Sequence, residues 1–364
     1  MDNNEKGSKR QGINLKRKIS LFNGITIIVG NVIGTGIFLS PKGVQLECGS
    51  PALSLIIWVV CGCITILGCL SYAELGTTIT KSGGAYIYTL EAFGPVIAFL
   101  QMWITVIVVQ PADMAILALM FGNYVVQPFF PDCDPPYYAV RLLAAACLLI
   151  VVFMNCWSVR YGTRIQDLFT IFKVLALLII TVTGICMLCI HGTSSGSFHK
   201  PWEGTTLTVG SIAFATYSGL YSFAGWDALN CVVEELQDPR KNLPKAIFAA
   251  VLTCTTIYLL TNVAYYAVLT PTELIATDAV AVGFAIKALG VVSWSIPIFV
   301  AMSVIGTLNS NYIAYSRTFY AGAKRGQLPS YLGMLYVLAY NRHFCLGNDL
   351  FASYQTSSST TTKI

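Results

Sequence analysis

The chain has 364 residues, of which 55% are hydrophobic and only 11% are charged, and its net charge is +5. Soluble domains carry roughly 25% charged residues, so this composition, with a mean hydropathy of +0.67, excludes an ordinary soluble domain. It predicts an all-α polytopic membrane protein.

Eight apolar segments along the chain are long enough for the roughly 20 residues that a helix needs to cross a bilayer. Before them, the polar residues 1–20 predict a basic cytoplasmic tail rather than a cleaved signal peptide. Lys and Arg are concentrated in the loops on the same side as this tail, which predicts a cytoplasmic N-terminus. The spans form a predicted core, 21–330, and residues 331–364 are predicted to be disordered. The spans run approximately over 21–45, 52–75, 93–121, 138–158, 167–190, 208–233, 244–268 and 291–320.

The first predicted span contains an unusual centre, where Gly34 and Gly36 flank Thr35. Glycine weakens a helix and lets another group approach the backbone closely. Taken alone, this stretch permits two interpretations. Small residues allow a neighbouring helix to pack closely, and a broken helix can bind a ligand.

The sixth predicted span contains a second interruption. Gly219 and Gly225 bracket aromatic residues there, and Asp227 lies well inside the span. An unpaired charge at that depth costs about 2.5–3.5 kcal/mol, so Asp227 is expected to face a cavity or a partner, unless it reaches interfacial water near a helix end. Spans one and six correspond in a five-plus-five arrangement. Two broken segments in corresponding positions indicate a transporter binding site, which favours ligand binding at the first break.

Seven stretches along the chain match, in the same order, the sequence motifs of one protein family. They are 28–43, 71–77, 81–86, 223–226, 239–244, 261–266 and 316–317. In these stretches the chain resembles the light subunits of heteromeric amino acid transporters, within the amino acid–polyamine–organocation superfamily. The resemblance extends from about residue 14 to about residue 330.

This resemblance implies a LeuT-like inverted-repeat helical bundle with discontinuous helices 1 and 6. In that fold, spans one to five and spans six to ten are inverted repeats. The family pattern continues to twelve spans, whereas the similarity stops soon after Pro329. The second repeat is therefore expected to be incomplete, with about eight of the twelve spans, and the chain to be truncated at its C-terminus.

The resemblance also implies an amino acid site between the two breaks. The backbone amides of 34–36 would receive the substrate carboxylate, which agrees with the positive end of a half-helix. Carbonyls around Ile33 and 221–224 would take the ammonium group. Tyr221 matches an aromatic position that closes over the substrate, although it could instead be an ordinary packing aromatic. The predicted substrate-binding residues are Ile33, Gly34, Thr35, Gly36, Gln110, Tyr221, Ser222, Phe223, Ala224, Gly225 and Asp227.

Two further residues acquire roles from the resemblance. Lys173, in the fifth span, would place its ammonium group where sodium-coupled relatives bind sodium; the alternative is that it snorkels to the inner interface. Cys133 lies in the predicted outer loop between spans three and four. The resemblance implies an intermolecular disulfide from Cys133 to a single-span glycoprotein heavy chain, whereas the alternatives are a free thiol or an internal pair, for which Cys48 is the clear outer candidate.

Span three bears on the substrate class. Gln110 stands where relatives that accept anionic or large neutral substrates carry Arg or Lys, and Asp113 follows one turn later. We therefore expect neutral or cationic amino acids rather than glutamate or cystine, unless Asp113 is turned toward another helix.

The sequence thus predicts a sodium-independent amino acid exchanger in the plasma membrane. The alternative is a truncated product that associates with a heavy chain without transporting. An eight-span channel or receptor is a weaker alternative, because no filter-like carbonyl run is apparent. No cofactor, metal or nucleic-acid partner is predicted, and no nucleophile–base set in the spans indicates an enzyme.

Overall fold

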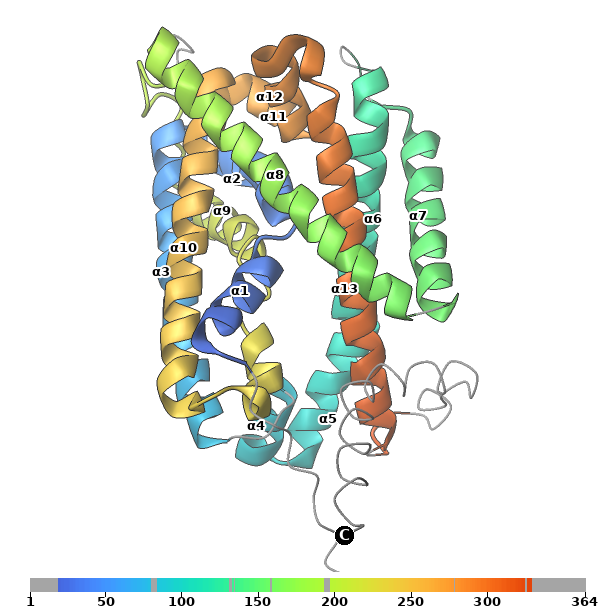
Figure 1. Cartoon of the computed structure of the whole chain (residues 1–364). Coiled ribbons are helices and arrows are strands. Elements are labelled where there is room, and N and C mark those ends of the chain that lie inside the picture. The colour runs from blue at the N-terminus through green and yellow to red at the C-terminus, as the bar shows by residue number, and fades with distance from the viewer. Residues whose placement is uncertain are drawn as a thin grey trace, which may run out of the picture.

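The computed structural model is a bundle of helices (Figure 1). It describes residues 19–79, 84–130, 133, 135–157, 159–192, 197–277, 279–324 and 326–328. The predicted tail, apart from Ile19 and Ser20, and the predicted disordered segment 331–364 lie outside these residues. Ile19 forms an isolated parallel bridge with Leu236, and Ser20 caps the first helix by accepting a hydrogen bond from the Asn23 amide.

Thirteen α-helices and four short 3₁₀ or π segments make up the described structure. The helices are α1 (Leu21–Val32), α2 (Gly36–Cys48), α3 (Pro51–Thr78), α4 (Gly84–Phe93), α5 (Pro95–Ile104), α6 (Gln110–Val126), α7 (Tyr137–Trp157), α8 (Val159–His191), α9 (Val209–Tyr221), α10 (Pro239–Val268), α11 (Pro271–Ala276), α12 (Val280–Leu289) and α13 (Ser295–Lys324). The short segments are η1 (Thr105–Val109), η2 (Gln127–Phe129), η3 (Ala228–Glu235) and η4 (Gly290–Val292).

Within the described residues, five helical stretches are long and apolar enough to cross a membrane, or up to six if α1 and α2 are one bent span. This confirms an all-α, multi-pass membrane protein. The five stretches are Pro51–Thr78, Pro95–Phe129, Tyr137–Asn155, Ile171–Ile190 and Pro239–Val268. The predicted sixth span, 208–233, folds as α9, a run of turns and η3, so it has no continuous helix of spanning length.

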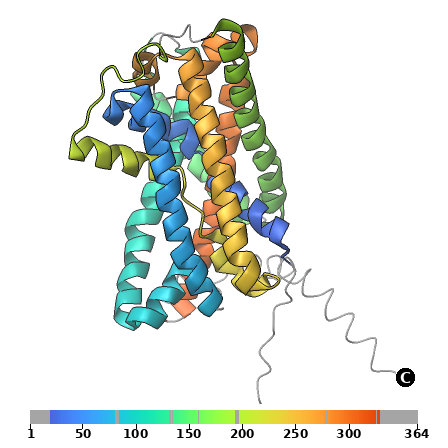
Figure 2. The same ribbon diagram turned by 90° about the vertical axis from the view of Figure 1, so that its left-hand side faces the viewer.

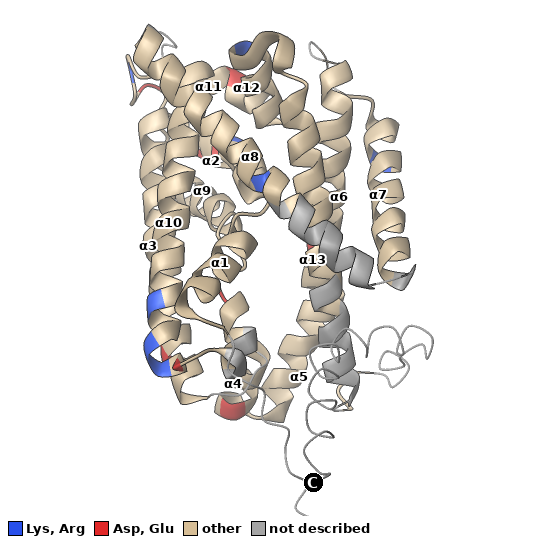
Figure 3. Ribbon diagram, viewed as in Figure 1, with Lys and Arg blue, Asp and Glu red and all other residues tan. Residues whose placement is uncertain are grey.

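α10 packs against α3, α8 and α1, and Figure 2 shows it lying between α3 and α8. The core combines aliphatic and aromatic side chains from nearly every long helix, among them the fully buried Trp58, Tyr258 and Phe284. Charged residues gather toward the two ends of the bundle, and the middle is largely uncharged (Figure 3). Burial in the core and apolar side chains facing outward are what a helix bundle in lipid requires.

The seventh predicted span begins earlier than expected. We predicted its start at Pro244, but α10 begins at Pro239, which occupies the first helical turn, after Asp238 with φ of 43°. A proline in the first turn is well tolerated because the missing N–H would have no helical partner there. Pro244 therefore lies inside the helix, and our prediction that the helix starts at Pro244 was wrong.

Two short helices, α11 and α12, fold over the end of the bundle between the seventh and eighth predicted spans, where no helix was predicted. Thr270 and Glu273 form a capping box at the start of α11, and Lys287 of α12 lies 2.5 Å from the Glu273 carboxylate. Burial raises the pKa of Glu273, but hydrogen bonds from Lys287 and Thr270 outweigh this and hold the pKa below its ordinary value. The carboxylate thus ties α11 to α12.

Candidate functional site

The first break separates α1 from α2 at residues 33–35, and the two helices meet there at an angle of 54°. The amides of Ile33 and Gly34 donate to the carbonyls of Val29 and Val32, and the Phe38 amide donates to Thr35. Because a helix leaves its first amides without helical acceptors, the N–H groups of Thr35, Gly36 and Ile37 have no backbone acceptor among the described residues. Thr35 makes no side-chain cap either. The break therefore presents free donors at the positive end of α2.

Gly34 differs in part from the prediction made for it. Its amide, 2.6 Å from the Val32 carbonyl, closes a tight turn and is already occupied in this structure. Of the three amides expected to receive a carboxylate, those of Thr35 and Gly36 are free within the described part of the chain, and Ile37 adds another.

The second break follows α9, where residues 222–227 form turns before η3. Amides at 222–224 donate to carbonyls three residues earlier, so this stretch is tightly wound rather than extended. Gly225 has a φ of 94°, which favours glycine. Asp227 starts η3 with a half-buried side chain, which makes no ion pair among the described residues.

The two breaks touch each other. A Cβ at Gly36 would lie 2.5 Å from the Cα of Ser222, closer than real Cβ atoms approach a backbone. A Cβ at Gly225 would lie 3.3 Å from the Asn31 carbonyl oxygen. Both glycines are needed for close backbone approach, so the packing and the ligand-binding interpretations of the first break are compatible.

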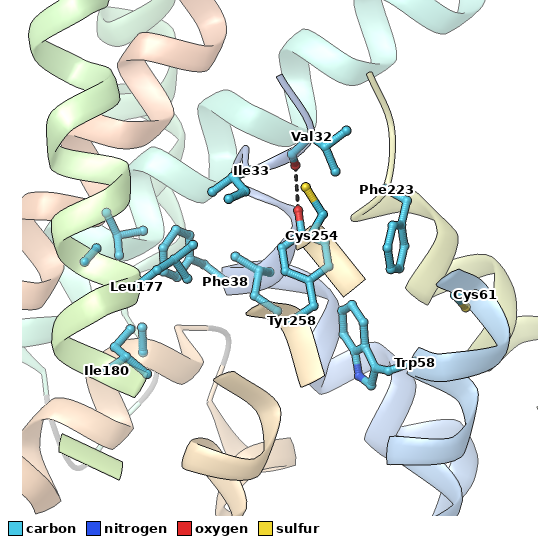
Figure 4. Packing of buried hydrophobic residues seen from close by; sticks show 14 of the residues in the cluster. Val32, Ile33, Phe38, Trp58, Cys61, Leu177, Ile180, Phe223, Cys254 and Tyr258 are labelled. Carbon is cyan, nitrogen blue, oxygen red and sulfur yellow. Dashed lines mark hydrogen bonds between the residues drawn. The ribbon is translucent and has the colours of Figure 1, made fainter. Parts of the chain in front are cut away.

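Tyr258 of α10 joins the breaks, and Figure 4 shows its hydrogen bond to Val32 of the first. Its hydroxyl lies 2.6 Å from the carbonyl oxygen of Val32 and 2.9 Å from that of Ser222. A phenol has one hydrogen, which it donates to one of these carbonyls at a time. The side chain is fully buried and makes a T-shaped contact with Phe223 at 5.1 Å between ring centroids.

The predicted residues of the second break divide by environment. Phe223 is buried against Trp58 and Tyr258, so its ring belongs to the core. Ala224 is exposed, and the Ser222 hydroxyl is buried without a hydrogen-bond partner in the described structure, beside Gly36. An unpaired buried hydroxyl costs free energy unless a ligand or water satisfies it.

Asp113 of α6 is turned toward other helices and holds Tyr221 in place. One carboxylate oxygen accepts from the Tyr221 hydroxyl at 3.3 Å. The other accepts from the Asn311 amide at 2.7 Å and from the Tyr315 hydroxyl at 2.8 Å. These contacts link α6, α9 and α13 beside the second break. Tyr221 therefore has a specific polar partner and is more than a packing aromatic.

Gln110 precedes Asp113 by one turn of α6 and lies on the same face. Its side chain is 4% exposed, and its Oε1 has no hydrogen-bond partner among the described residues. A π-helical turn, η1, comes immediately before it, and Pro111 follows it. Proline removes a helical donor and crowds the preceding turn, and π-helical turns occur frequently at functional sites.

Lys173 and Cys133 lie in contrasting environments. Lys173 is 3% exposed, which does not fit a side chain that snorkels freely into water, and no described carboxylate pairs with it. Cys133 is exposed and is a free thiol, as is the buried Cys48, so the described structure does not pair the two.

Sequence reasoning missed Tyr258, Asn311 and Tyr315. Tyr258 lies in an apolar run and carries no local signal of its role. Asn311 and Tyr315 are four residues apart and so share a face of α13, and the polar cluster around Asn311 inside an apolar span was a usable signal.

An amino acid permease family model matches residues 19–335. The chain is 47% identical over 340 residues to the large neutral amino acids transporter small subunit 2 of Homo sapiens, covering 92% of this chain and 62% of that protein. It is 43% identical over 334 residues to the cystine/glutamate transporter of Homo sapiens, covering 92% and 66%, respectively. With the Asc-type amino acid transporter 1 of Mus musculus it shares 45% over 329 residues, covering 89% and 61%.

An all-helical, multi-pass membrane protein with two discontinuous helices that meet at the bundle centre has the architecture of a transporter. The chain belongs to the amino acid permease family, which confirms the resemblance found in the sequence. It spans about three-fifths to two-thirds of the length of these relatives, from 61% to 66%.

Proposed function

We propose that the protein is a sodium-independent amino acid exchanger that binds substrate between the breaks at 33–36 and 221–227. The observation that carries this proposal is the contact of two broken helices beside free amides at the start of α2. Those amides suit a carboxylate, and nearby carbonyls suit an ammonium group. Exchange requires that this site open alternately to each side as the half-helices move.

The direct test is counter-exchange in proteoliposomes that contain the full chain, with and without a heavy chain. Radiolabelled amino acid inside should leave faster when unlabelled amino acid is added outside. Substrate-induced thermal stabilisation of the purified protein reports binding separately. Binding without exchange would favour a non-transporting role, and absence of both would contradict the proposal.

We expect exchange to proceed at the same rate, within about twofold, when choline replaces sodium. The buried ammonium of Lys173 supplies a positive charge within the bundle, at the position where the resemblance places the sodium of sodium-coupled relatives. Lys173→Met removes this charge and should slow exchange by about tenfold or more. Lys287→Met is the matched control, since Lys287 pairs with Glu273 at the surface. A strict sodium requirement in the unaltered chain would contradict this prediction.

We infer that Cys133 forms the disulfide with a single-span glycoprotein heavy chain on the extracellular side of the plasma membrane. Its exposure supports this assignment, because an exposed thiol in an oxidising compartment can reach a partner. Co-expression followed by non-reducing electrophoresis should show a covalent complex that Cys133→Ser abolishes. Cys63→Ser, which alters another exposed cysteine, should retain the complex.

Neutral or cationic amino acids are the proposed substrates. Asp113 is turned toward α9 and α13, which is the alternative that the sequence left open, but its partners there are neutral hydrogen-bond donors. No described cation pairs with it, so its negative charge still supports this proposal. The relatives do not decide the matter, because their names include both large neutral amino acids and cystine with glutamate. Glutamate uptake exceeding that of leucine and arginine would contradict the assignment.

A further inference from the structure

We propose that Asp113 forms the side-chain subsite of the transporter and selects amino acids whose side chains end in a hydrogen-bond donor, cationic or neutral. This inference rests on the proposed function and specifies the substrate class of the same site. It starts from a carboxylate placed inside the bundle and surrounded by donors.

One oxygen of this carboxylate accepts fewer hydrogen bonds than the other. Oδ2 accepts two good hydrogen bonds, from Asn311 and Tyr315, whereas Oδ1 accepts a single long one of 3.3 Å, from Tyr221. A carboxylate can accept about four hydrogen bonds, so Oδ1 has room for another donor. Asp113 is half-buried and has no ion-pair partner among the described residues.

The position of Asp113 relative to the breaks is suited to a substrate side chain. Ser222 touches Gly36 at the start of α2, and the preceding residue, Tyr221, directs its hydroxyl to Asp113. A substrate whose carboxylate lies on the α2 amides would therefore have its side chain near α6 and α13. The buried and unpartnered Oε1 of Gln110, one turn away on the same face, adds a second acceptor.

This subsite discriminates between substrates by whether their side chains end in a hydrogen-bond donor. Oδ1 and the Gln110 oxygen are both acceptors, so an ammonium, guanidinium or amide terminus can satisfy them. An aliphatic terminus would leave both unsatisfied, and a carboxylate terminus would be repelled by Asp113. Hydrogen bonds to charged groups are stronger than neutral ones and are poorly screened away from water.

Three substrates of similar length test this selection. Lysine and glutamine end in donors, and norleucine has the aliphatic chain of lysine without its ammonium group. In the full chain, lysine and glutamine should stabilise the purified protein at lower concentrations than norleucine and exchange in preference to it. Asp113→Asn should lower the lysine-to-norleucine preference by about tenfold. Asp113→Glu, which retains the carboxylate, should keep lysine preferred, and Tyr315→Phe, which removes one supporting donor, should have a smaller effect.

The matched control is Glu203→Gln, the same chemical change at an exposed carboxylate that pairs only with Lys200 at the surface. It should leave every preference unchanged. An unchanged lysine-to-norleucine ratio in Asp113→Asn, with exchange intact, would overturn this inference and leave the proposed function standing. If Asp113→Asn does not fold, a lysine-to-norleucine ratio that stays unchanged in Tyr315→Phe, which removes a donor to the same carboxylate, overturns it equally. If the unaltered chain neither binds nor exchanges any amino acid, the proposed function itself is overturned.

Discussion

Gly36→Ala should abolish most amino acid exchange. The added methyl group would lie 2.5 Å from the Cα of Ser222. Neither can rotate away, because the backbone fixes the position of a Cβ and the Cα is itself backbone. Overpacking of this kind costs about 1–3 kcal/mol, and here the strain falls between the two breaks that form the site. We expect substrate affinity to fall by about tenfold or more, measured by substrate-induced thermal stabilisation and by counter-exchange in proteoliposomes.

Gly30→Ala is the matched control for this experiment. Gly30 lies in α1, six residues before Gly36, and a Cβ there meets nothing within 4 Å. Alanine also favours the helix relative to glycine by about 0.5–1 kcal/mol, so this variant should fold and exchange normally. Equal loss of exchange in both variants would show that any added methyl group in this segment is harmful, and would contradict the specific contact between the breaks.

Tyr258→Phe should give the second largest effect. The change removes the one donor that the Val32 and Ser222 carbonyls share. The Val32 carbonyl still accepts from the Gly34 amide, whereas no other donor to the Ser222 carbonyl lies among the described residues. An unsatisfied buried polar group costs about 1–3 kcal/mol. Since these carbonyls border the two breaks, part of that cost should appear as weaker substrate binding, by about tenfold, together with a lower melting temperature.

Tyr266→Phe separates the two parts of that effect. The hydroxyl of Tyr266 is also buried in α10, but it contacts Gln45 and Ser54, away from the breaks. Its loss should lower the melting temperature to a similar degree and leave substrate affinity unchanged within about twofold. If both variants lower stability equally and neither changes affinity, Tyr258 stabilises the fold without organising the site.

Apolar segment lengths predicted most of the fold correctly. The segments 52–75, 93–121, 138–158, 167–190 and 244–268 each correspond to a long helix, because about 20 apolar residues can satisfy their backbone in lipid only as a helix. Helix ends were predicted less well, as at Pro239, since a proline is compatible with either the first turn or a helix interior. The short helices α11 and α12 were missed, because both are far shorter than the roughly 20 residues by which the spans were recognised.

The candidate site was predicted unevenly for a similar reason. Glycines within an apolar span indicate an irregular backbone, so the breaks around Gly34–Gly36 and Gly225 were visible in the sequence. The partners that hold the breaks were not, because Tyr258 is far from both in the sequence and resembles any buried tyrosine. The roles of Lys173 and Cys133 stay predictions.

The sequence by itself determined three properties. The protein is a multi-pass helical membrane protein, two of its helices are interrupted at positions visible in the sequence, and it belongs to the amino acid permease family. These properties depend on local composition and short motifs, which act on the chain near their own position. Only the tertiary structure decided that the breaks touch through Gly36 and Ser222, that Tyr258 joins them, and that Asp113 accepts from α9 and α13. Contacts between residues 100 or more positions apart depend on how whole helices pack, and no local pattern encodes that arrangement.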